Sequence, residues 1–201
     1  RNPVTTGLCD TQGGAGGTVE PLRYHGFPVR SSKVVFVLDI SRSMGWNGRL
    51  ERARQELIDV LEGLPRTTRF NLVVFSERAY RWEGSLVVAS LVNVRRAVGF
   101  LQRTEPQSGT AAYEALEAAF AEPDVDTIFF LSDGHPSGGT VLDPELILAD
   151  VANWNRVRRV RVHAIALMLG EPPLAFAGTE DAERATDFMR RLAEENDGSF
   201  K

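Results

Sequence analysis

The chain has 201 residues, of which 43% are hydrophobic and 25% charged, with a net charge of −4 and a pI of about 5.5. This length suits one domain that buries roughly 70% of its unfolded surface. The acidic balance excludes a global basic field that attracts nucleic acid, the lone Cys9 excludes an intrachain disulfide, and no apolar run reaches the roughly 20 residues of a membrane span. We therefore expect neither a nucleic-acid partner nor membrane insertion by this fragment.

Residues 1–32 are rich in Gly, Thr and Pro and have no apolar period, which predicts a flexible or extended N-terminal arm. We interpret the chain as a fragment, because it begins at Arg1 and stops where a strand after Gly198 is starting. Only two of its 23 basic residues are lysines, a bias typical of a GC-rich genome, so we expect a bacterial source. The compartment stays open between cell-surface or extracytoplasmic and cytoplasmic.

Several continuous apolar runs rich in β-branched residues are typical of strands buried on both faces of a sheet. The clearest is KVVFVLD, which ends on the carboxylate of Asp39. A mixed stretch over residues 79–89 predicts an edge strand or hairpin. The predicted buried strands cover residues 33–39, 69–76, 126–132 and 159–169.

Apolar residues at helical spacing separate these strands. Leu50, Leu57 and Leu61 fall on one stripe, and Asp143 followed by Pro144 is the pattern of an N-cap and first turn. The predicted helices cover residues 49–63, 92–103, 110–121, 143–158 and 180–196. This alternation predicts an α/β fold with three layers, whose doubly wound and mostly parallel central sheet carries one antiparallel edge strand.

In such sheets, ligands bind beyond the carboxyl ends of the strands. Asp39, Ser41 and Ser43 alternate in the turn after the first strand, Thr110 begins a helix, and Asp133 ends the DTIFFLS strand. Two carboxylates and three hydroxyls are hard oxygen ligands, which suit Mg²⁺ or Mn²⁺ better than zinc. The sequence therefore predicts a divalent-metal site at this edge of the sheet.

These motifs resemble the metal-ion-dependent adhesion site of the von Willebrand factor type A domain family, which includes integrin inserted domains. The family pattern is Asp-x-Ser-x-Ser, then a Thr, then an Asp, and it falls here in DISRS, SGTAAYEAL and FFLSDG. The resemblance covers residues 33–201, with the last strand truncated. It implies a Rossmann-like domain with a complete site for Mg²⁺, or for Mn²⁺ or Ca²⁺.

The resemblance also implies roles for the five residues. Ser41, Ser43 and Thr110 are expected as direct ligands, Asp39 as a charged anchor behind them, and Asp133 as a group that acts through water. A partner's carboxylate, or a water in its place, completes the coordination. We expect the Thr110 side chain to cap its helix as well.

Three further residues are expected on the rim that a partner would meet: Arg42, Trp46 and His135. Arg42 stands where Gly is frequent in the family, and its charge together with the metal is expected to favour an acidic partner. Trp46 follows the metal turn and is either exposed there or packed on the adjacent loop. His163 lies in an apolar strand and is expected as a packed or edge histidine.

Three functions fit this site. The first is a binding module without catalytic residues, whose metal accepts a Glu or Asp from a protein partner or from another domain of the parent protein. The alternative is a phosphatase-like hydrolase that uses the same metal, for which His135 is the nearby acid–base candidate. The third is a scaffold whose metal site has lost its role.

Overall fold

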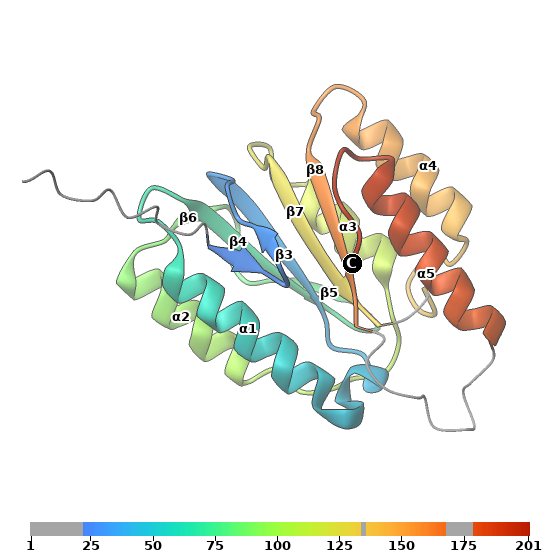
Figure 1. The fold of residues 1–201 in the computed structure, drawn as a ribbon, viewed down its shortest axis with the longest axis horizontal. Coiled ribbons are helices and arrows are strands. Elements are labelled where there is room, and N and C mark those ends of the chain that lie inside the picture. The colour runs from blue at the N-terminus through green and yellow to red at the C-terminus, as the bar shows by residue number, and fades with distance from the viewer. Residues whose placement is uncertain (1–21, 134–135, 168–178) are drawn as a thin grey trace, which may run out of the picture.

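The computed structural model describes residues 22–133, 136–167 and 179–201, and it places helices on both faces of one central sheet (Figure 1). The strand order is β5-β4-β3-β7-β8, and β6 also pairs with β4. Strands β3, β4, β7 and β8 are parallel, whereas β5 and β6 run antiparallel to β4. The bounds are Lys33–Asp39 (β3), Arg69–Phe75 (β4), Ala79–Arg81 (β5), Val87–Val88 (β6), Thr127–Ser132 (β7) and Arg161–Ala166 (β8).

The helices form the two outer layers, with α1 and α2 on one face and α3, α4 and α5 on the other (Figure 1). Their bounds are Arg49–Gly63 (α1), Leu91–Gln102 (α2), Ala112–Phe120 (α3), Pro144–Asn155 (α4) and Thr179–Glu194 (α5). This arrangement confirms the predicted α/β class, the mostly parallel sheet and the antiparallel edge over residues 79–89.

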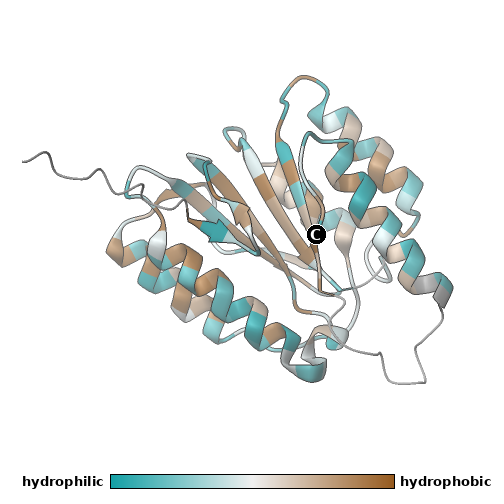
Figure 2. Cartoon of the chain, in the orientation of Figure 1, coloured by the Kyte–Doolittle hydropathy of each residue, from teal (hydrophilic) through white to brown (hydrophobic). Residues whose placement is uncertain are grey.

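Strand β3 is buried on both faces because its alternate side chains enter two different cores. Val34, Phe36 and Leu38 pack toward α1 and α2. Val35 and Val37 pack on the opposite side, with residues of α3, α4 and α5. The central strands are mainly hydrophobic in Figure 2, whereas the helices mix both characters, since only one side of each helix faces the sheet.

Part of the predicted arm packs on the domain. Strands β1 (Arg23–Tyr24) and β2 (Phe27–Pro28) form a short antiparallel hairpin. The Tyr24 ring is 1% exposed and meets Phe36 and Phe129 edge-on at centroid distances of 5.4 and 5.5 Å. Residues 1–21 of the arm lie outside the described residues.

The predicted elements differ from the structure mainly at their ends. Helix α4 begins as expected, with the Asp143 side chain accepting from the Glu145 N–H, but it stops at Asn155. Arg159 then adopts a φ of 54°, so the next strand starts only at Arg161. At the chain's end, Phe200 forms a parallel bridge with Ala164 beside β8.

The prediction that Thr110 caps its helix is wrong. Helix α3 starts at Ala112, and Ala111 holds the N-cap position with no side-chain cap hydrogen bond. The preceding chain is held out of the helix, because Gly109 has a φ of 82° and the Ala111 N–H donates to Ser76 O at 2.6 Å. Within the described ranges, no helix has the length and apolar character required to span a bilayer.

Candidate metal centre

The turn after β3 brings two serine hydroxyls together. Asp39 ends the strand fully buried, and its Oδ1 accepts the Ser41 N–H at 2.7 Å. An Asp that bonds to the backbone two residues ahead stabilises a turn, so the chain folds back over the carboxylate. As a result, the hydroxyl oxygens of Ser41 and Ser43 lie 3.0 Å apart.

Strand β7 lies beside β3 and places the carboxylate of Asp133 next to the turn that follows β3. The two strands are in parallel register with Leu38 opposite Leu131, so their carboxyl ends meet. Ser43 Oγ donates to Asp133 Oδ1 at 2.8 Å, and Ser132 Oγ donates to Asp39 Oδ2 at 2.5 Å. Four of the five predicted ligands therefore belong to one hydrogen-bonded cluster.

The fifth predicted ligand, Thr110, is 5% exposed and lies on a loop anchored to the same strand ends. Gln107 forms a parallel bridge with Ser41, and the Gln107 N–H donates to Ile40 O at 2.8 Å. From the other side, the Ser137 N–H donates to Thr110 O at 3.2 Å. The backbone of Thr110 is thus held between the end of β3 and the segment that follows β7.

The spacing of these oxygens fits a small hard cation. Mg²⁺ binds oxygen at about 2.0–2.1 Å in octahedral geometry, which sets neighbouring ligand oxygens roughly 2.9 Å apart. The Ser41–Ser43 oxygen separation of 3.0 Å and the Ser43–Asp133 separation of 2.8 Å are close to that value. Among the described residues, no group of three or more His, Cys, Asp or Glu side chains could hold a metal. The predicted donor set at the strand ends has three hydroxyls and no thiolate or imidazole, which disfavours zinc.

The chemistry of Asp39 also suits a nearby cation. Burial raises the pKa of the Asp39 carboxyl from 3.8 to about 7, and repulsion from Asp133 acts in the same direction. Hydrogen bonds from Ser132 and Ser41 favour the charged form but do not compensate for burial. A divalent cation held near the two carboxylates would favour their charged forms and so oppose both causes of the shift.

Comparison with known proteins identifies the family of the domain. Residues 34–135 match the family model described as the von Willebrand factor type A domain, which covers half of the chain. The chain belongs to the von Willebrand factor type A domain family.

Two human relatives and one solved structure extend the comparison. Inter-alpha-trypsin inhibitor heavy chain H4 of Homo sapiens is 34% identical over 57% of this chain, and heavy chain H6 of Homo sapiens is 31% identical over 86%. The chain spans only 13% of the length of each. The structure of a von Willebrand factor type A protein from Catenulispora acidiphila superposes with a TM-score of 0.68, at 18% identity, over 84% of this chain and 38% of that one. The superposition at this low identity shows that the two proteins share a fold.

The predicted rim of this von Willebrand factor type A domain is described in part. Arg42 is exposed in the turn between the two serines, and its role on the rim stays a prediction. Trp46 was expected either to be exposed or to pack on the adjacent loop, and its half-buried side chain is intermediate between the two. His135 lies outside the described residues, and its rim position stays a prediction.

Sequence reasoning missed Arg49, the first residue of α1. Its guanidinium Nη1 lies 2.7 Å from Asp133 Oδ2, and the two side chains are 7% and 0% exposed. Nothing in the local pattern separates Arg49 from the arginines that follow it on the same helix. The contact between Arg49 and Asp133 depends on Asn47 and Gly48, whose positive φ angles of 52° and 67° turn the chain toward the site.

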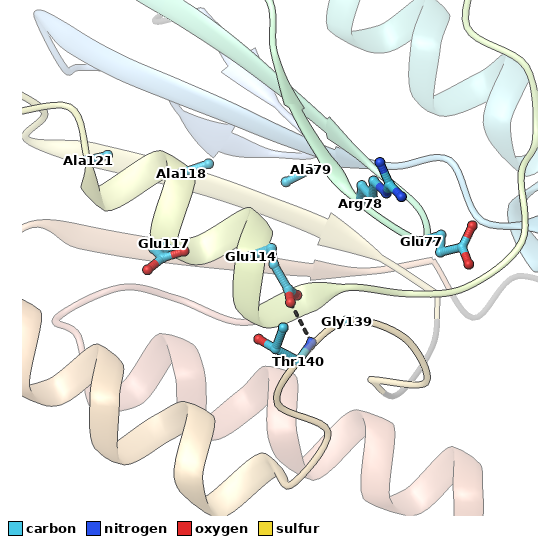
Figure 3. Close-up of a pocket in the computed structure, with 9 residues that line it drawn as sticks. All are labelled: Glu77, Arg78, Ala79, Glu114, Glu117, Ala118, Ala121, Gly139 and Thr140. Atoms are coloured by element: carbon cyan, nitrogen blue, oxygen red, sulfur yellow. Dashed lines mark hydrogen bonds between the residues drawn. The ribbon is translucent and has the colours of Figure 1, made fainter.

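Sequence reasoning also missed Glu114, which accepts a backbone hydrogen bond from Thr140. From α3, Glu114 points at Gly139 and Thr140, and the Thr140 N–H donates to Glu114 Oε1 at 2.5 Å (Figure 3). These residues line one end of a groove of about 650 Å³ beside α3. Because Ser137 and Gly138 donate to Thr110 O, this clamp links α3 to the segment that faces Thr110.

Proposed function

We propose that this domain is a metal-dependent protein-binding module. It binds Mg²⁺, or Mn²⁺ or Ca²⁺, through Asp39, Ser41, Ser43, Thr110 and Asp133. The observation that carries the proposal is the convergence of Ser41, Ser43 and Asp133 oxygens at spacings that fit an octahedral cation. The metal would supply a coordination position that accepts one carboxylate.

The proposed partner is a protein, or another domain of the parent protein, that offers a Glu or Asp side chain. Exposed Arg42 beside the cluster supports an acidic partner, because its charge adds to that of the metal. The chain spans a small part of its curated relatives, which supports a role as one module of a larger protein. We infer a bacterial parent from the arginine-rich composition.

Metal binding is tested by titrating Mn²⁺ and Mg²⁺ into the purified chain by isothermal calorimetry. We expect saturable binding by the wild type, reversal by a chelator, and loss of binding in Asp39→Ala. Arg52→Gln, an exposed change on α1, serves as the folded control. Absence of binding at millimolar Mn²⁺ would contradict the proposal and favour a scaffold role.

Carboxylate binding is tested by water-proton relaxation of the Mn²⁺-loaded chain. Acetate should displace metal-bound water and lower the relaxivity, whereas acetamide, which is neutral and of similar shape, should not. An equal response to acetate and acetamide would contradict the proposal that the metal binds a carboxylate. Metal-dependent turnover of a generic phosphoester would favour the hydrolase alternative instead.

A further inference from the structure

The proposed metal centre already contains a buried cation. Arg49 is 6% exposed, and its Nη1 donates to Asp133 Oδ2 at 2.7 Å. The other oxygen of Asp133 accepts from Ser43 at 2.8 Å. Both oxygens of this carboxylate are therefore engaged, one by a guanidinium and one by a serine that the metal would bind.

Helix stability does not account for a positive charge at this place. Arg49 is the first residue of α1, where the helix dipole disfavours cations. Burial of a charged group costs free energy unless a partner compensates it, and here the compensation comes from Asp133. The position of this pair at the proposed metal centre gives it a consequence for the metal.

Arg49 makes the net charge of the centre one unit more positive. Two ionised carboxylates, Asp39 and Asp133, would leave a bound divalent cation neutral overall. With the guanidinium included, the loaded centre carries one net positive charge, which one incoming carboxylate neutralises. Without it, the same carboxylate would leave the centre with one net negative charge.

We infer that Arg49 sets the relative affinities of the site for the metal and for the partner's carboxylate. It binds Oδ2 of Asp133, lowers the affinity of the site for the metal, and raises the affinity of the metal-loaded site for a carboxylate. This inference rests on the proposed function. It makes Arg49 a positioning residue, because it acts through Asp133.

The test compares Arg49→Gln with Arg49→Lys, using Mn²⁺ alone and then acetate as probes. Glutamine keeps a hydrogen-bond donor and removes the charge, whereas lysine keeps the charge. We expect Arg49→Gln to bind Mn²⁺ about tenfold tighter or more, since a like charge close to the ion is removed. The same variant should respond to acetate at several-fold higher concentration. Arg49→Lys should stay within about threefold of the wild type in both measurements.

A purely structural role for Arg49 would not move the two affinities in opposite directions. Arg52→Gln removes the same charge from an exposed position of α1 and should change neither. If Arg49→Gln unfolds in chelator but folds on addition of Mn²⁺ more completely than Asp39→Ala does, the inference is supported. If the wild type binds Mn²⁺ and Arg49→Gln binds it equally or more weakly, this inference alone is overturned. If neither chain binds Mn²⁺, the proposed function fails, and the inference fails with it.

Discussion

Ser43 Oγ donates a hydrogen bond to Asp133 Oδ1 at 2.8 Å, although 90 positions separate the two residues. The bond joins the turn after β3 to the end of β7, so it closes the candidate centre between two neighbouring strands. The centre is therefore assembled by the pairing of strands, and its properties are testable through the residues that close it.

Replacement of Ser43 by Ala should weaken Mn²⁺ binding by about tenfold or more, because it removes one proposed ligand. The free energy of unfolding should fall by only about 1 kcal/mol, the usual value of one hydrogen bond. Calorimetry and urea denaturation measure the two quantities. Ser90→Ala is the matched control, since it removes the N-cap of α2 at a cost of about 1 kcal/mol and should leave the metal affinity unchanged.

Gly139 should not tolerate a side chain. Its φ is 94°, and an added Cβ would lie 2.1 Å from Glu114 Oε2. Gly139→Ala should therefore displace the segment that faces Thr110, lower the stability by about 1–3 kcal/mol, and weaken Mn²⁺ binding. In Gly84→Ala an added Cβ meets nothing within 4 Å, so thermal unfolding and calorimetry should detect little change. Equal stability and equal Mn²⁺ affinity of the two variants would show that the contact between Glu114 and residues 139–140 does not support the site.

The hairpin before β3 should contribute strongly to stability through one ring. Tyr24→Ala removes a side chain that is 1% exposed, and we expect a loss of about 3 kcal/mol in urea denaturation. Tyr80 is 47% exposed, so Tyr80→Ala should cost less than about 0.5 kcal/mol. A loss below about 1 kcal/mol for Tyr24→Ala would mean that residues 22–32 are a dispensable attachment.

Stability should decrease in acid partly through His163. Burial and then the charge of Arg161 lower the pKa of the His163 imidazole below 6.5, and its Nδ1 accepts the Ser199 N–H at 3.2 Å. A lowered pKa in the folded state means that the unfolded chain binds the proton more tightly. The contribution is therefore complete above pH 6.5 and is lost as the pH falls through the folded-state pKa.

Urea denaturation at pH 7.5 and pH 5.0 measures this effect in the wild type and in His163→Phe. The variant keeps a ring between Phe27 and Phe129 but cannot be protonated. The wild type should lose more stability than the variant between the two pH values. An identical loss in both chains would assign the acid sensitivity to other groups.

The class of fold and the position of the strand ends follow from the local pattern of residues. Apolar runs such as KVVFVLD can only be buried on both faces, and their alternation with helical stripes leaves a parallel sheet as the solution. Because strands end where the apolar run ends, Asp39 and Asp133 could be placed at one edge of the sheet. Helix ends follow the local pattern less closely. Asp143 caps its helix as predicted, whereas Thr110 does not, because the Ala111 N–H donates to Ser76 O and the Ser137 N–H donates to Thr110 O, which holds that loop outside the helix.

The contacts between distant side chains depend on how the elements pack in three dimensions. Arg49 and Asp133 are 84 positions apart, and an arginine among other arginines on one helix carries no local sign of its partner. The contact requires two successive positive φ angles, at Asn47 and Gly48, and the adjacency of β3 and β7. The local sequence pattern identifies the candidate ligands of the metal. The positive charge of Arg49 beside them is brought there only by folding.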